Sequence, residues 1–178
     1  MKKYFLILTI LLTMALVGGC SWITAFFTIS YELNEMGHTD AEWEMEYIDL
    51  TDDDDYDEHQ DNIILVYSIS VVADIINHGS LDASGELWID TVDTWTTPLE
   101  IRDNAVKLFD SGPVHAGETL SIDWASSFTY METDGIFFLQ DLVINRGNFY
   151  VYGLPDVQPF DLSIDGEVVV TVIYRVTD

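Results

Sequence analysis

Thiols and basic side chains are the scarcest groups in this chain. Of its 178 residues one is a cysteine, Cys20, so the chain can form neither an internal disulfide nor a zinc site built from several thiolates. Six Lys and Arg stand against 32 Asp and Glu, which gives a formal net charge of −26. A surface of this sign repels the phosphates of nucleic acids, and we expect no nucleic-acid partner.

Motifs for catalysis are also missing from the sequence. There is no G-x-S-x-G nucleophile elbow and no glycine-rich loop that would hold a phosphate. The four histidines are dispersed and lack HExxH spacing. We therefore predict that the protein is not an enzyme and has no resident cofactor, a weakly bound Ca²⁺ ion excepted. An accessory role beside a hydrolase is a remaining alternative.

The first twenty residues carry the clearest signal in the chain. Lys2 and Lys3 supply a positive start, residues 4–17 are apolar apart from threonine and one tyrosine, and Gly18-Gly19 precedes Cys20. This order is typical of a secretory signal. Its end resembles the lipobox of bacterial lipoproteins, a resemblance that implies cleavage before Cys20 and acylation of the thiol. Residues 4–29 also fit an uncleaved signal anchor, and ordinary secretion is a third alternative.

Lipidation at Cys20 would fix both the domain organisation and the location. Residues 1–19 are then the signal peptide, and residues 20–178 form one acidic domain. The mature chain keeps four basic residues and all 32 acidic ones, a formal charge of −28. More than one acyl chain suffices for stable anchoring. We expect the protein on the extracytoplasmic face of a cell membrane or an outer membrane.

Alternation of apolar and polar residues with a period of two dominates the rest of the chain. Strands are predicted at residues 27–33, 42–48, 62–77, 83–90, 105–110, 119–124, 149–152 and 162–176. In the second of these, Trp43, Met45 and Tyr47 are expected to face the core. The third is rich in β-branched residues and is expected to be a central strand with one continuous apolar face.

One short helix is predicted near residues 134–145, capped by Asp134 and ended by Gly147. About eight short strands with turn signals between them favour an all-β fold, a single antiparallel β-sandwich. Segments 71–83 and 113–124 resemble strand ends and turns of immunoglobulin-like sandwiches. The tail from residue 147 is similar to the end of the late-embryogenesis-abundant type 2 sandwich. Both resemblances imply a fold and not a function.

The run of acids at residues 49–61 is predicted to be a loop, because its carboxylates repel one another. Oxygen ligands of the kind that calcium prefers are offered by Asp53, Asp55, Asp57 and Asp61. An EF-hand register fails here, since Glu58 stands where the glycine is required. A weak calcium site and a solvated loop without a ligand both remain open.

Aromatic side chains suggest a second kind of site. Trp95 lies in a predicted threonine-rich loop and is the tryptophan most expected to be exposed. The further members of a platform for stacking sugars or a partner's side chains are Trp88 and Trp124, with Tyr130, Tyr150 and Tyr152. The alternative is that most of these side chains belong to the core.

Together these observations predict a membrane-anchored, non-catalytic lipoprotein. Its partners would be the membrane, through Cys20, and a protein or glycan of the cell envelope, where it acts by interaction or as a structural module. The second hypothesis is a ligand-binding module for a glycan or for Ca²⁺.

Overall fold

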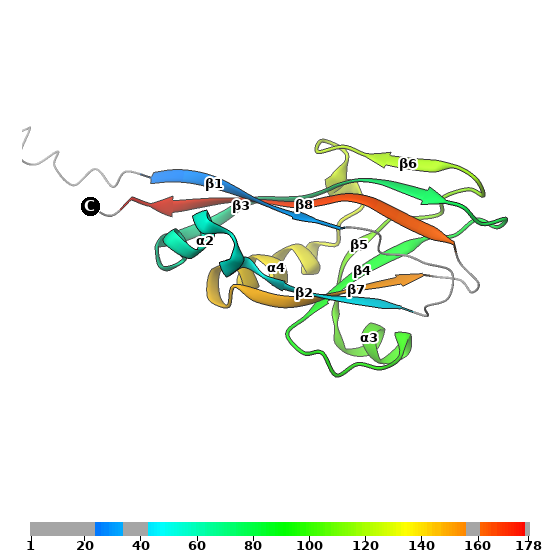
Figure 1. Cartoon of the computed structure of the whole chain (residues 1–178), viewed down its shortest axis with the longest axis horizontal. Coiled ribbons are helices and arrows are strands. Elements are labelled where there is room, and N and C mark those ends of the chain that lie inside the picture. The colour runs from blue at the N-terminus through cyan, green and yellow to red at the C-terminus, as the bar shows by residue number, and fades with distance from the viewer. Residues whose placement is uncertain (1–23, 34–42, 156–160, 177–178) are drawn as a thin grey trace, which may run out of the picture.

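Two four-stranded sheets pack face to face in the computed structural model (Figure 1), which describes residues 24–33, 43–155 and 161–176. The order in sheet A is β1 (Thr24–Glu32), β8 (Leu162–Arg175), β3 (Ile63–Asn77) and β6 (Thr119–Ile122). The order in sheet B is β2 (Glu44–Asp49), β7 (Asn148–Pro155), β4 (Gly85–Asp90) and β5 (Val106–Asp110). Every pairing is antiparallel, which confirms the predicted all-β sandwich. Cys20 and the predicted signal lie outside the described residues.

The two sheets bury one apolar layer between them. In sheet A, Val168 and Val170 of β8 stand opposite Val71 and Ile69 of β3, and all four are buried. Sheet B supplies the facing side chains, which include Ile48, Leu87, Ile89, Phe149 and Val151. Branched and aromatic residues fit such a pleated, half-buried surface, so the alternation in sequence and the packing agree.

β3 does not keep one apolar face along its whole length, contrary to the sequence prediction. Its register with β8 shifts between Ile63 and Leu65 and again between Val66 and Ser68. Each shift inserts one residue into β3, and a one-residue insertion moves the next side chains to the other face. Val66 is therefore buried, whereas Leu65 and Tyr67 are exposed.

β2 presents the face opposite to the predicted one. Ile48 in β2 and Leu50 just after it are buried. Because alternate residues of a strand share a face, the glutamates of β2 also point inward. Glu46 is satisfied there, because the hydroxyl of Tyr31 donates a hydrogen bond to its carboxylate at 2.6 Å. The outward positions, predicted to be inward, are Trp43, Met45 and Tyr47.

The predicted helix is present as α4 (Thr133–Asn145), which packs against β5 and β3. Gly135 allows this approach, since a Cβ there would lie 2.3 Å from the carbonyl oxygen of Lys107. Gly147 has a φ of 76° and ends the helix as predicted. Asp134 is not the predicted cap, because it lies inside the first turn.

The acidic segment is helical, which corrects the prediction of a loop. It forms a 3-10 turn (Leu50–Asp52), α2 (Asp54–His59) and a second 3-10 turn (Gln60–Asn62). Asp53 caps α2 by accepting a hydrogen bond from the Tyr56 N–H at 3.0 Å. Acidic residues in the first turn also suit the positive end of a helix. Capping and the burial of the Tyr56 ring therefore outweigh repulsion between the carboxylates.

A third helix, α3 (Pro98–Asn104), lies below sheet B in Figure 1 and was not among the predictions. Thr97 caps it and Pro98 opens it, an arrangement that suits a helix start. β6 ends two residues before the predicted limit of its strand, and the chain then forms a 3-10 turn (Ser127–Thr129). None of the helices in the described ranges is long and apolar enough to cross a bilayer.

Candidate functional site

The outer face of sheet B gathers aromatic side chains from separate segments of the chain. Strand register places Tyr47 of β2 opposite Tyr150 of β7, and Trp88 of β4 opposite Tyr152 of β7. The name aromatic surface is used below for Trp43, Tyr47, Trp88, Trp95, Tyr150 and Tyr152. Ring centroids lie 5.0 Å apart for Tyr47 and Tyr150, a tilted contact within the range that aromatic pairs prefer.

Tyr152 is the structural base of this surface. It is fully buried beneath α3, where it packs with Ile101 and Leu154. Its hydroxyl donates a hydrogen bond to the carbonyl of Val92, which holds the segment before α3 against the sheet. Burial, reinforced by the nearby charge of Asp90, raises the pKa of Tyr152 to about 12, so the ring stays neutral and hydrogen-bonded.

Carboxylates orient the two tryptophans that pack against the cluster around Tyr152. The indole N–H of Trp95 donates to Asp90 at 2.8 Å, and that of Trp88 donates to Glu86 at 3.1 Å. The Lys107 ammonium lies 5.8 Å from the centre of the Trp88 ring, within cation–π range. Both indole N–H groups are therefore engaged, and Lys107 covers one face of the Trp88 ring.

Glu86 also joins α3 and β5 to the sheet through ion pairs. Its carboxylate accepts from Arg102 Nε at 2.9 Å and lies 3.5 Å from Lys107 Nζ. Arg102 donates in addition to the carbonyl of Pro155 at 2.8 Å. Lys107 forms a second pair with Asp110 at 2.8 Å, and this hydrogen bond raises the pKa of Lys107. The network is half-buried and links Trp88 and its strand to α3 and β5.

The accessible part of the aromatic surface lies along β2 and β7. Tyr47 is 48 % exposed and Met45 beside it 40 %, whereas Tyr150 is half-buried. Asp90 stands opposite Tyr150 in the next strand, so acidic groups border the rings. Exposed ring faces beside carboxylates can stack on planar groups and attract cations.

The structure brings together two of the three tryptophans predicted to form a platform. Trp88 and Trp95 share the aromatic surface, whereas Trp124 follows β6 of sheet A and is not part of it. Trp43 and Tyr47 belong to the surface but were assigned to the core by alternation alone. Ile48 and Leu50 are the residues that could have shown this in the sequence. They alternate with the aromatic residues along the strand, and burial of these two aliphatic side chains decides which face of β2 is turned toward the core.

The acidic segment shows no preformed cation site. Asp53 is engaged as the cap of α2, and Asp57 accepts a hydrogen bond from the Gln60 amide at 3.1 Å. Asp55 and Asp61 are exposed. In the part of the chain that the structure describes, no group of three or more His, Cys, Asp or Glu side chains is arranged to hold a metal. Calcium binding by this segment stays a prediction.

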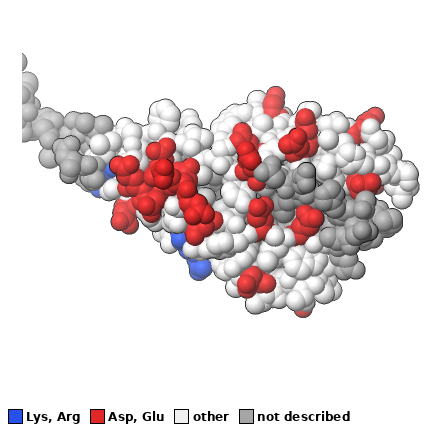
Figure 2. Space-filling model, in the orientation of Figure 1, with Lys and Arg blue, Asp and Glu red and all other residues white. Residues whose placement is uncertain are grey.

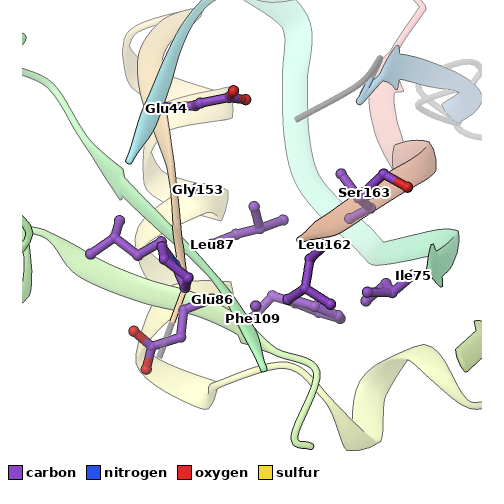
Figure 3. A pocket seen from close by; sticks show the side chains of 12 residues that line it. Glu44, Ile75, Glu86, Leu87, Phe109, Gly153, Leu162 and Ser163 are labelled. Carbon is purple, nitrogen blue, oxygen red and sulfur yellow. The ribbon is translucent and has the colours of Figure 1, made fainter. Parts of the chain in front are cut away.

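A small cavity lies between the sheets, at the end of β3 that is distant from α2 (Figure 3). Its volume is about 50 Å³, and the side chains around it are mostly apolar, among them Ile75, Leu87, Phe109 and Leu162. Such a volume has room for a few water-sized groups, far below the roughly 300 Å³ of a pocket for a small-molecule ligand. The cavity therefore fits a packing defect better than a binding site.

Comparison with known proteins identifies no family for this β-sandwich. None of the family models and none of the curated proteins matches the chain. Among solved structures, a chain of Desmodium yellow mottle tymovirus is similar over 88 % of this chain and 90 % of its own, with 11 % identity and a TM-score of 0.37. A chain of turnip yellow mosaic virus gives 11 % identity and a TM-score of 0.36, over 89 % and 84 %. At these scores neither likeness bears on function.

Proposed function

We propose that this protein is a lipoprotein of a bacterial envelope that binds a protein partner through the aromatic surface and performs no chemistry. Anchoring at Cys20, on the extracytoplasmic side of a cell or outer membrane, is supported by the signal-like pattern of residues 1–20. Binding is supported by one observation above all. Separate segments of the chain converge to place six aromatic side chains on one outer sheet face, with Tyr152 buried as their base and Tyr47 exposed.

The chemistry of this surface fits a partner that offers basic and apolar side chains. Tyr47 and Met45 supply exposed apolar area, and the Tyr47 and Tyr150 rings can accept a cation on their faces. Asp90 adds negative charge beside them. The formal charge of −28 expected for the mature chain would also accelerate encounters with a basic partner.

The anchor is tested by metabolic labelling with palmitate. The wild-type chain should incorporate the label and fractionate with membranes, and globomycin should block its processing. Cys20→Ser should lose the label, because the thioether can form only at this thiol. Equal labelling of wild type and Cys20→Ser would contradict the proposal.

The binding surface is tested by photo-crosslinking in intact cells. A photoreactive residue in place of Tyr47 should yield a protein adduct that weakens as the salt concentration rises, because screening reduces electrostatic attraction. The matched control carries the same residue in place of Phe137, which is 64 % exposed on α4 and outside the aromatic surface. Equal adducts at the two positions would show that the aromatic surface is not the contact.

Glycan binding is the second candidate, and the tilted Tyr47–Tyr150 pair favours it because two adjoining ring faces suit the flat side of a sugar. Binding to a glycan array should then fall in Tyr47→Ala and in Trp95→Ala and persist in Phe137→Ala. Unchanged glycan signals in both surface variants would remove this candidate.

A further inference from the structure

A second surface, on the outer face of sheet A, differs in chemistry from the rest of this acidic protein. Strand register aligns Phe26 of β1 with Ile173 of β8, and Ile173 with Leu65 of β3. These three residues are called the apolar row. Phe26 is 75 % exposed, and Leu65, which lies between the two register shifts of β3, is 41 % exposed. Single exposed apolar residues are common, but a row across three strands forms a continuous patch.

Polarity changes in steps along the same face. Thr24 and Arg175 form the row nearest the end of the sheet, and the apolar row comes next. Two uncharged rows follow, built from Thr28, Thr171 and Ser68 and then from Ser30, Val169 and Ser70. Val169 and Ser70 are buried, so the hydroxyls that reach the surface are chiefly those of Thr28 and Ser30 in β1. Glu32 and Glu167 stand in the row after these. From the end of the sheet inward, the face therefore carries a cation, then apolar side chains, then hydroxyls and only later acids. This order suits a lipid–water interface.

Acidic groups at this end lie on the other side of the sheet. His59 of α2 stacks on Tyr174 at 4.0 Å and lies 6.0 Å from Phe27, measured between ring centroids. Tyr174 and Phe27 alternate with Ile173 and Phe26, so α2 covers the face opposite the apolar row. Figure 2 shows acidic side chains crowded at the end of the molecule that carries α2. A surface in contact with the apolar row would therefore leave these acids pointing away from it.

Chain length indicates what covers the apolar row. Four residue steps separate Cys20 from Thr24, where β1 begins. A fully extended chain spans at most about 3.6 Å per residue, so these two residues lie within about 14 Å of each other. If Cys20 carries lipid, as proposed above, Phe26 two residues further on is within reach of the headgroup region.

We infer that the apolar row docks the sandwich on the bilayer surface beside its own lipid anchor. This inference rests on the proposed anchoring at Cys20. The contact fixes the orientation of the domain: the outer face of sheet A turns toward the lipid, and the aromatic surface on sheet B turns toward the aqueous side. The lipid surface involved is zwitterionic or weakly charged, because the domain as a whole is strongly acidic.

Spin labelling of the full, acylated lipoprotein in phosphatidylcholine vesicles tests the inference. A nitroxide is placed at Thr28→Cys, next to the apolar row, and in a separate protein at Phe137→Cys on α4. Acylation protects Cys20 from the label. The Thr28 label should be severalfold less accessible to a water-soluble nickel reagent than the Phe137 label, and severalfold more accessible to oxygen. Adding Phe26→Glu and Leu65→Glu should restore nickel access at position 28, with circular dichroism confirming the fold.

The outcomes separate the two proposals. Palmitate incorporation with equal nickel access at positions 28 and 137 overturns docking and leaves the anchor in place. Missing palmitate overturns both. Protection at position 28 that disappears when the protein is diluted into excess vesicles shows that a second copy of the chain covers the row, which also overturns docking on lipid. Protection that survives dilution and is lost with the two glutamates supports it.

Discussion

Tyr56 is the residue that ties the acidic segment to the core. Its ring is buried, and its hydroxyl donates to the carbonyl of Val143 at 2.7 Å. Val143 stands in the last turn of α4, where helical carbonyls lack partners within the helix. Burial raises the pKa of Tyr56, so the hydroxyl remains a donor at neutral pH. One phenol thus anchors α2 and satisfies the end of α4.

Replacing Tyr56 by phenylalanine should lower the free energy of unfolding by about 1 kcal/mol, because one buried hydrogen bond is lost and the Val143 carbonyl is left without it. Urea unfolding followed by fluorescence measures the change. Tyr67→Phe is the matched control, since Tyr67 is 70 % exposed and should change stability by less than about 0.5 kcal/mol. Equal effects of the two substitutions would contradict the anchoring role of Tyr56.

His115 offers a pH-dependent contact at the residue scale. Its Nδ1 lies 2.8 Å from the carboxylate of Asp82, and this hydrogen bond raises the pKa of His115 while lowering the pKa of Asp82. A raised pKa in the folded state means that the histidine contributes stability fully below its unfolded pKa of roughly 6.5. This contribution is lost as the pH rises through the higher folded value.

An NMR titration of the His115 ring should therefore give a midpoint above that of an ordinary histidine. Asp82→Asn should lower the midpoint, because the acceptor then carries no charge. Glu118→Gln should lower it less, since Glu118 acts on His115 only through its charge and Asp82 also through the hydrogen bond. A midpoint that does not respond to Asp82→Asn would show that the pair does not persist in solution.

Element packing depends on close backbone approach at one point of α4. Gly135 lies where a Cβ would come within 2.3 Å of the Lys107 carbonyl oxygen and 2.5 Å of the Leu108 Cα in β5. Neither backbone atom can move without displacing the strand. Gly135→Ala should therefore destabilise the fold by about 1–3 kcal/mol, the usual cost of overpacking. Phe137→Ala on the exposed side of the same helix should stay within about 0.5 kcal/mol, and both are measured by urea unfolding.

Sequence patterns located the strands well but predicted less well which side chains of each strand face the core. Alternation located β2, yet its aromatic positions point outward because Ile48 and Leu50 decide the parity. It also located β3, but inserted residues change the side that Leu65 presents. Bulges of this kind depend on pairing with a distant strand, which no local pattern contains. The helical acidic segment was missed for a related reason, since its anchor, Val143, lies 87 residues further along the chain from Tyr56.

The same limit applies to the candidate site. Trp88 and Trp95 were predicted as site residues from their residue type alone. Their grouping with Tyr47 depends on the order of β2, β7 and β4 in sheet B. Trp124 looks equivalent in sequence and lies after a strand of the other sheet. Residue type therefore suggested a candidate aromatic site, and strand order decides which side chains lie together.

At the scale of the whole molecule, two faces of opposite sheets carry different chemistry. The outer face of sheet B presents aromatic rings bordered by Asp90, and the outer face of sheet A presents the apolar row and hydroxyls. In the arrangement we propose, a single anchor at Cys20 would turn sheet A to the lipid and leave sheet B free for a partner. Acidic residues elsewhere on the surface would keep other copies of the chain at a distance.

Charge repulsion of this size makes stability depend on ionic strength. A formal charge of −26, or −28 in the mature chain that we propose, opposes the compact state, and salt screens the repulsion. The melting temperature should rise between low and moderate NaCl concentrations. Salt also weakens ion pairs, but the described ranges contain few of them, chiefly those around Glu86 and Lys107. A melting temperature that falls with salt would show that those pairs outweigh the general repulsion.

Calcium separates general screening from a specific site in the acidic segment. If the carboxylates act only through their overall negative charge, CaCl₂ and NaCl should raise the melting temperature equally at matched ionic strength. A specific site, as the sequence allows for Asp53, Asp55, Asp57 and Asp61, should give an extra rise with calcium and a heat of binding in calorimetry. Both signals should then vanish when Asp53, Asp55 and Asp57 are changed to asparagine. Because Asp53 already caps α2 and no cation-holding group is arranged in the described residues, we expect equal effects of the two salts.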